Sequence, residues 1–199
     1  MLPALFNLCG MKKFCVLLIG AILCAAQPAF AQVQRNGFHG GVAAGAGLLS
    51  LHVPGENKPR KSAEPSFPNI QLGWMIGPKT AITLYLPGTL YKNTWNGRPR
   101  DRGFEGIIPG VQYWVTERWW VAGGIGFGLD APAFYDIKNE DERKFHFGYG
   151  CLLSSGYEFW QTTHFSMDAR VRLHYNNVPV PGGGLSGFSA NALLGVNWW

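Results

Sequence analysis

Residues 163–175, THFSMDARVRLHY, separate into two faces at a period of two. One face is apolar, and the other carries His164, Asp168, Arg170, Arg172 and His174. A helix of about 3.6 residues per turn would place Asp168 and Arg170 on different sides, so the pattern predicts a β-strand with one apolar and one ionic face. A run of about 13 residues is long for a globular strand, which averages about 5–6, but suits a tilted strand that crosses a bilayer.

The composition agrees with a membrane barrel. The 199 residues include 27 glycines and 8 tryptophans, with only 15% charged residues, which is unusual for a soluble protein and expected of a barrel with aromatic girdles. The formal net charge is +5, and no basic run alternates with aromatic residues. The sequence therefore does not indicate a nucleic-acid partner.

The N-terminal residues have the three parts of a secretory signal. A charged start at Met11, Lys12 and Lys13 precedes the apolar residues 14–26, and Ala-Phe-Ala at 29–31 supplies a cleavage site. We expect a signal peptide over residues 1–31, and the sequence leaves open whether translation starts at Met1 or at Met11.

The mature chain, residues 32–199, is then one outer-membrane β-barrel domain. Its single cysteine, Cys151, has no partner for an intramolecular disulfide, so its stability has to come from the sheet. Cys24 suggests a lipoprotein signal instead, but Leu23 before it is larger than the small residue of such cleavage sites.

Eight segments of the mature chain alternate in the same way, with three tight turns near Pro78, Glu117 and Gln161. The polar stretches 52–66, 87–102, 130–144 and 176–185 are expected to be long loops. Such an asymmetry is typical of bacterial outer-membrane barrels, which have short periplasmic turns and longer extracellular loops. The sequence thus predicts an all-β, eight-stranded, antiparallel up-and-down transmembrane barrel. The expected strands are 37–51, 67–76, 80–86, 103–115, 119–129, 145–159, 163–175 and 186–199.

The two faces of these strands predict two sets of residues. Polar side chains that face inward would form a paired, hydrogen-bonded network filling a lumen too narrow for a water channel. Aromatic side chains near the strand ends would lie at the membrane interfaces. The lumen set is His39, Gln71, Gln112, His146, Glu158, His164, Asp168, Arg170, Arg172, His174 and Asn191. The interface set is Trp74, Trp119, Tyr157, Phe159, Trp198, Phe127, Phe145 and Tyr175.

Three segments carry a resemblance to a known group. GFHGGVAAGAG, GYEFWQTTHFSMDARVRLHY and the terminal LLGVNWW resemble the small bacterial outer-membrane barrels of the OmpA/OmpX-like β-barrel group. The resemblance implies outer-membrane lipid and lipopolysaccharide as surroundings. It also implies recognition of the C-terminal strand by the barrel-assembly machinery, although Trp199 is one residue out of phase with the alternation that ends at Trp198.

A weaker similarity points to an enzyme. The sequence His174-Tyr175-Asn176-Asn177 is similar in position and residue types to the His-x-Ser-Asn stretch of the outer-membrane lipid A 3-O-deacylases. This resemblance implies ester hydrolysis by a His, a Ser and an acid. Asn176 stands at the position of the nucleophilic Ser, and residues 186–199 contain no acid. A nucleophile requires a hydroxyl or thiol beside its base, so no catalytic residue is assigned.

No metal or cofactor site is expected. Glu140, Asp141 and Glu142 are consecutive, whereas a calcium loop spaces its ligands at alternate positions, and the five histidines lack zinc-like spacing. We expect a non-enzymatic protein of the Gram-negative cell surface, with an envelope-structural or binding role through four extracellular loops and their extracellular partner. The alternatives are a lipid A-modifying hydrolase and a soluble periplasmic barrel that binds an apolar ligand.

Overall fold

The computed structural model describes residues 35–95, 98–133, 135 and 144–199. The expected signal peptide and the acidic stretch 140–142 lie outside these residues. Within the described part, the regular secondary structure is β-strand, and there is no helix long and apolar enough to cross a membrane. The strands are β1 (Phe38–His52), β2 (Arg60–Gly77), β3 (Thr80–Leu86), β4 (Gly88–Trp95), β5 (Arg98–Trp114), β6 (Trp119–Pro132), β7 (His146–Gln161), β8 (Phe165–Val180) and β9 (Gly183–Trp198).

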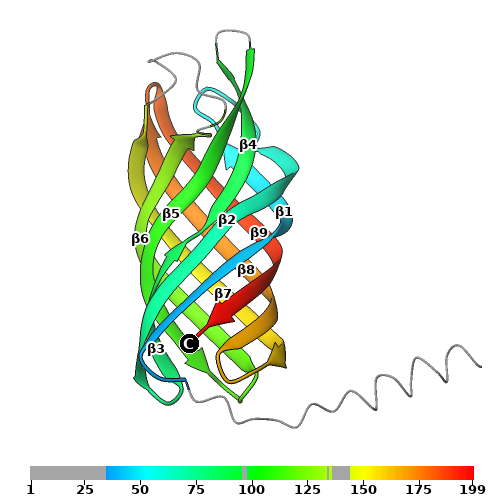
Figure 1. Cartoon of the computed structure of the whole chain (residues 1–199). Coiled ribbons are helices and arrows are strands. Elements are labelled where there is room, and N and C mark those ends of the chain that lie inside the picture. The colour runs from blue at the N-terminus through cyan, green and yellow to red at the C-terminus, as the bar shows by residue number, and fades with distance from the viewer. Residues whose placement is uncertain (1–34, 96–97, 134, 136–143) are drawn as a thin grey trace, which may run out of the picture. The chain divides into compact units, whose positions relative to one another are not determined.

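The strands close into a ring of antiparallel neighbours (Figure 1). β1 pairs with both β2 and β9, so the first and the last strand are neighbours. β3 pairs with β2 and with β5, and β4 continues beside β5 after the interruption at Pro87. β3 and β4 therefore share one position in the wall, and the nine strands make the eight-stranded up-and-down barrel that the sequence predicts.

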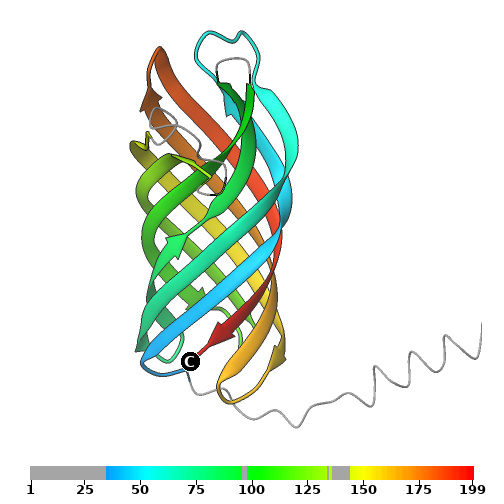
Figure 2. The same ribbon diagram turned by 45° about the horizontal axis from the view of Figure 1, so that its top comes forward.

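The two ends of the barrel differ. At one end, here called the turn end, short connections join β2 to β3, β5 to β6 and β7 to β8, and the C-terminus lies there (Figures 1 and 2). At the other, the hairpin end, paired strands project as hairpins, of which the β4–β5 hairpin extends far beyond its neighbours (Figure 1).

Three of the stretches predicted to be long loops are largely strand. β2 begins at Arg60, β4 and the start of β5 occupy most of 87–102, and β8 and β9 approach each other to within the two residues Pro181 and Gly182. Gly182 has a φ of +93°, a conformation that glycine adopts without strain and that suits a two-residue hairpin. The prediction of long loops was wrong here because these extensions are polar on both faces and lack the alternation that marks a strand.

Candidate functional site

The outer face of the barrel wall is apolar. Large side chains such as Ile125, at 76% exposed, and Leu48, at 68%, point away from the barrel. Soluble monomers rarely expose a contiguous apolar patch beyond a few hundred Å². An apolar band that encircles a barrel is instead typical of a wall in contact with lipid.

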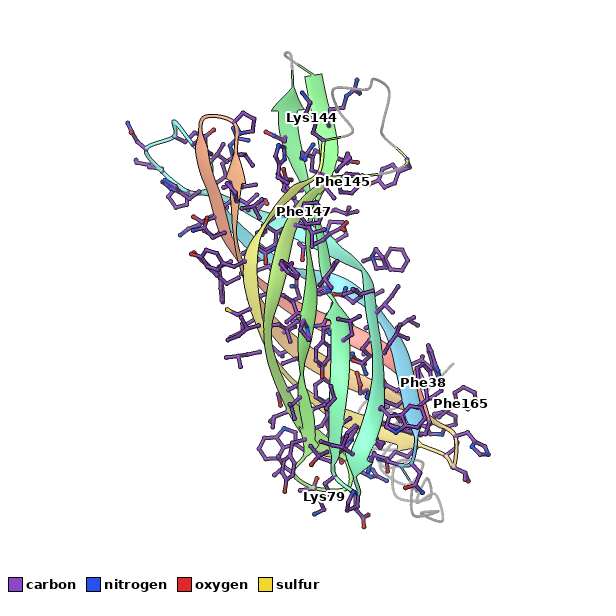
Figure 3. The ribbon with its side chains drawn as sticks, turned by 90° about the vertical axis from the view of Figure 1, so that its left-hand side faces the viewer. Phe38, Lys79, Lys144, Phe145, Phe147 and Phe165 are labelled. Atoms are coloured by element: carbon purple, nitrogen blue, oxygen red, sulfur yellow. The ribbon has the colours of Figure 1, made fainter. Side chains whose placement is uncertain are left out.

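Aromatic residues gather toward both ends of this band. Figure 3 shows Phe38 and Phe165 toward the turn end and Phe145 and Phe147 toward the hairpin end, with Lys79 and Lys144 beyond them. Each of these four phenylalanines is about half exposed. Of the residues predicted for the interfaces, Tyr175 and Trp198 are half-buried and the others are exposed; those others are Trp74, Trp119, Tyr157, Phe159, Phe127 and Phe145.

Inside the barrel, the turn end is closed by an ion pair between aromatic rings. Nη2 of Arg35 lies 2.9 Å from Oε2 of Glu158, and Nε1 of Trp114 donates to Oε1 of the same carboxylate at 2.9 Å. The Arg35 guanidinium also stands over the rings of Trp114 and Trp199, at 4.8 and 5.2 Å from their centroids. Glu158 is fully buried, so its charge is held by these partners.

The ring contacts of Trp199 account for its departure from the alternation of the last strand. Its ring stacks on His39 with centroids 5.6 Å apart and lies 5.3 Å from the ring of Trp114. Trp198 faces outward beside Gly40, while Trp199 turns into the lumen. The terminal pair therefore serves both faces of the wall.

A second layer lies farther along β8. Asp168 and Arg170 project from the same face of the strand and form a two-pronged pair, with N–O distances of 2.6 and 2.7 Å. Nη1 of Arg170 donates to Oε1 of Gln71 at 2.8 Å. Asn197 accepts from Arg170 at 3.0 Å and donates to Asp168 at 2.8 Å, so every charge in this layer has a partner.

Arg172 and His174 lie next to this layer with fewer partners. Nη1 of Arg172 donates to Oδ1 of Asn69 at 2.7 Å, but its Nε and Nη2 make no hydrogen bond within the described residues. Neither ring nitrogen of His174 has such a partner among the described residues. The His174 ring packs 5.1 Å from the ring of Phe104.

The structure places most of the predicted lumen residues together. The members that are buried inside the barrel are His39, Gln71, Gln112, Glu158, Asp168, Arg170, Arg172, His174 and Asn191. His146 is half-buried at the hairpin end. His164 departs from the prediction because β8 begins only at Phe165, which leaves His164 exposed in the turn before it.

His174, the centre of the hydrolase alternative, is buried inside the barrel. His174 is only 1% exposed and points into the lumen, where Gly106 and Phe104 cover it, so a lipid outside the wall has no access to it. Within the described residues, no hydroxyl or thiol is hydrogen-bonded to either ring nitrogen. The described residues also contain no group of three or more His, Cys, Asp or Glu side chains placed to hold a metal ion.

An acid near the hairpin end gathers four donors. Asp130 accepts a hydrogen bond from the Tyr91 hydroxyl at 2.7 Å and from Nε and Nη2 of Arg102 at 2.8 and 2.7 Å. Nδ1 of His146 lies 3.3 Å from Oδ2 of Asp130. Because His146 pairs with Asp130 one position beyond Phe147, this cluster lies at the hairpin-end margin of the apolar band.

The pKa values of this cluster reflect its burial and its charges. Burial raises the pKa of Tyr91 well above its usual value, and the neighbouring negative charge of Asp130 raises it further. Burial lowers the pKa of Arg102, but the hydrogen bonds and attraction of Asp130 outweigh it, so the pKa rises overall. Tyr91 therefore remains a neutral donor and Arg102 remains charged.

This cluster forms one side of a pocket of about 200 Å³ in the mouth of the barrel, here called the mouth pocket. The opposite side is apolar. The pocket is lined by Val53, Pro54, Tyr91, Asn93, Arg102, Asp130, Lys144, His146, Val180, Pro181 and Leu185. A packed group closes the barrel below it: Leu49, Leu51, Tyr91, Phe104 and Leu185.

Sequence reasoning did not find Arg35, Tyr91, Arg102 or Asp130. Arg35 precedes the first strand, and the other three lie in or beside stretches predicted to be loops. Thr89 and Tyr91 are two residues apart and share the inner face of β4, and this period of two is the one signal that was available in the sequence.

Comparisons with known proteins identify a fold but no family. No family model matches the chain, and no curated protein is similar enough in sequence to count as a relative. The crystal structure of Neisserial surface protein A matches with a TM-score of 0.54 and 16% identity, over 82% of this chain and 97% of that one. The attachment invasion locus protein Ail of Yersinia pestis matches with a TM-score of 0.46 and 11% identity, over 80% and 99% of the two chains.

The match to Neisserial surface protein A is close enough to establish the architecture. At this level of identity, the likeness extends to the fold and no further. The chain has the fold of a small outer-membrane β-barrel, and the predicted resemblance to that group is confirmed at the level of the fold. The likeness to lipid A deacylases receives no support from these structures.

Proposed function

We propose that this chain is a non-catalytic outer-membrane β-barrel protein of the Gram-negative envelope that works by binding at its extracellular rim. The observation that carries the proposal is the contrast between the lumen and the hairpin end. The lumen is filled by the Arg35–Glu158 and Asp168–Arg170 layers, whereas β4 and β5 project past the apolar band. A filled barrel with extended hairpins presents its binding surface at the rim.

The proposal includes an orientation. The turn end and both termini of the barrel face the periplasm, and the hairpin end faces outward. Residues 1–31 act as the cleaved export signal, and β9 is the strand that the assembly machinery recognises. The apolar band contacts membrane lipid.

The charge at the rim favours lipopolysaccharide as the neighbouring molecule. Lys58 and Lys61, near and at the start of β2, and Lys92, on β4, are exposed at the hairpin end. Basic side chains close to an anionic membrane surface contribute roughly 1 kcal/mol each to attraction at that surface. Phosphates of lipopolysaccharide fit this requirement.

Fractionation with a heat-shift gel tests the barrel and its location. The outer-membrane fraction of expressing cells is run on SDS gels with and without boiling. We expect a band in that fraction whose apparent mass changes on boiling, because a closed barrel resists the detergent until heated. Recovery in the soluble periplasmic fraction, with no shift, would instead support the carrier of an apolar ligand.

Cysteine labelling tests the orientation. In a background in which Cys151 is replaced by Ala, we compare Lys92→Cys at the hairpin end with Lys79→Cys at the turn end. A membrane-impermeant maleimide should label the Lys92 variant on intact cells and the Lys79 variant only after the outer membrane is opened. The reverse pattern would contradict the proposed orientation.

A further inference from the structure

The mouth pocket combines two surfaces that suit different parts of one ligand. Val53, Val180 and Leu185 give it an apolar side, and the Asp130 cluster gives it a polar side. Its volume of about 200 Å³ lies below the range of roughly 300–1,000 Å³ that is usual for drug-sized ligands. A ligand that fits is therefore about one ring or one short chain in size.

The polar side offers hydrogen-bond donors. Both Nε and Nη2 of Arg102 are used by Asp130, but its Nη1 makes no hydrogen bond within the described residues. His146 contacts Asp130 through Nδ1, and when its ring carries both protons its Nε2 is a second donor, which makes no hydrogen bond within the described residues. Asp130 holds both side chains in place, so these donors are positioned in advance.

The balance of charge favours an anion. Among the described residues that line the pocket, Arg102, Lys144 and His146 are basic and Asp130 is acidic. The acid is already neutralised by its ion pair with Arg102, at 2.7 Å, so it does not repel a second carboxylate strongly. A guanidinium with a free N–H edge recognises a carboxylate through charge-assisted hydrogen bonds.

A packed layer of described residues lies beneath the pocket. Leu49 and Phe104, each 1% exposed, form the packed layer directly beneath it. Lys144 is exposed and Asn93 is half-buried, so the pocket is reached from the hairpin end. This arrangement suits the capture of a ligand at the surface.

We propose that the mouth pocket binds a small carboxylate with an apolar body, with the carboxylate on Nη1 of Arg102 and Nε2 of His146 and the apolar body against Val53, Val180 and Leu185. This inference rests on the proposed function for the pocket's exposure to the outside of the cell. It adds a ligand class and a position to that function.

Fluorine NMR of the folded protein in detergent micelles tests the proposal. The probes are 4-fluorobenzoate and the neutral 4-fluorobenzyl alcohol, which share a ring and differ in charge. We expect 4-fluorobenzoate to bind at least tenfold more tightly than the alcohol. We also expect Arg102→Lys, which keeps the charge but loses the free guanidinium edge, to weaken 4-fluorobenzoate binding by about tenfold.

Two residues of β4 provide the matched variants. Asn93 lines the pocket and Leu90 lies on the opposite face of the strand, so Asn93→Phe should abolish binding while Leu90→Phe leaves it within about twofold. The heat-shift gel confirms that each variant is folded. A variant that does not shift is replaced by Val180→Phe, which fills the same pocket from β8.

Equal binding of the acid and the alcohol, or unchanged binding in the folded Asn93→Phe variant, would overturn this inference. Such a result would leave the heat shift and the surface labelling intact, and with them the proposed function. Failure of the wild-type protein to shift on boiling or to reach the outer membrane would contradict the proposed function itself.

Discussion

Arg170 and Arg172 lie two residues apart on the same face of β8 and are both buried, yet their partners differ. Arg170 has the carboxylate of Asp168, whereas Arg172 has one amide oxygen, that of Asn69, and the ring of Tyr85 at 5.9 Å. A buried guanidinium without a counter-ion has lost its hydration and has gained little in return. The two residues should therefore have opposite effects on stability.

Replacing each arginine by Met tests this difference. Arg170→Met leaves the buried carboxylate of Asp168 without its ion pair, and we expect the free energy of unfolding to fall by about 3–5 kcal/mol. Arg172→Met removes two donors that lack acceptors, and we expect an increase of about 1–3 kcal/mol. Urea unfolding in lipid vesicles measures both. Equal losses in the two variants would show that Arg172 has a partner as strong as Asp168.

Tyr91 gives a pH dependence of known sign. Its pKa is raised by burial and by Asp130, so the folded chain keeps the phenol proton at a pH where the unfolded chain loses it. The stabilisation is complete below the usual tyrosine pKa of about 10 and falls by up to about 1.4 kcal/mol per pH unit above it.

The variant Tyr91→Phe isolates this effect. At pH 8 it should lower the free energy of unfolding by about 1.5–3 kcal/mol, because the hydrogen bond lost is one to a charged acceptor. Above pH 10 the difference between the variant and the wild type should narrow. Unfolding curves from pH 8 to 11 measure it, and a difference that stays constant over that range would contradict the raised pKa.

At the scale of the strand, tryptophan and glycine pair across the sheet. Trp120 on β6 lies opposite Gly156 on β7, and both face the lumen. A Cβ atom at Gly156 would lie 2.5 Å from Cζ2 of Trp120, so the fully buried indole occupies the space that a side chain would need. Gly156 is therefore required for the packing of Trp120 and has no role in a turn.

Alanine at two glycines separates packing from backbone effects. Gly156→Ala should cost about 1–3 kcal/mol through overpacking against Trp120. Gly123, on the outer face of β6, is the control, since its nearest neighbour would be the flexible end of Leu153 at 3.2 Å, and Gly123→Ala should change stability by less than about 0.5 kcal/mol. Urea unfolding compares the two. Losses of similar size would mean that both positions need glycine for the backbone.

Strands inside the apolar band could be predicted from the sequence, and strand extensions beyond it could not. Segments with one apolar and one polar face, such as β8 from Phe165 to Tyr175, were predictable because lipid and lumen impose opposite requirements on alternate residues. Beyond the apolar band both faces meet water or other polar groups, so the alternation disappears while the backbone pairing continues. For this reason β4 and the first residues of β5 escaped prediction, and with them Tyr91 and Arg102.

The lumen network was predictable in part of its membership and not in its partners. Alternation places Asp168 and Glu158 inside, but the pairing of Glu158 with Arg35 depends on closure of the barrel, which brings residues 123 positions apart together. Trp199 is a similar case, because its turn into the lumen follows from the space beside His39 and Trp114 and leaves no periodic signal.

At the scale of the whole molecule, the lumen is closed by layers in series. The Arg35–Glu158 pair, the Asp168–Arg170 pair and the apolar group beneath the mouth pocket each fill part of the interior. We expect an ion that crosses the barrel to meet all three groups, so that opening one of them alone gives no path.

Planar-bilayer recording tests this series arrangement. We expect no conductance steps from the wild-type protein in 1 M KCl. At this salt concentration the Debye length is about 3 Å, so surface charge alone cannot account for the absence of steps. Phe104→Ala thins the apolar layer and should remain silent, because the two ionic layers persist. Steps in this variant would show that the apolar layer is the sole barrier, and steps in the wild type would show that the interior is open. A porin recorded in the same membranes confirms that channels are detectable. Silence of the wild type and of Phe104→Ala beside a conducting porin would agree with a function at the rim.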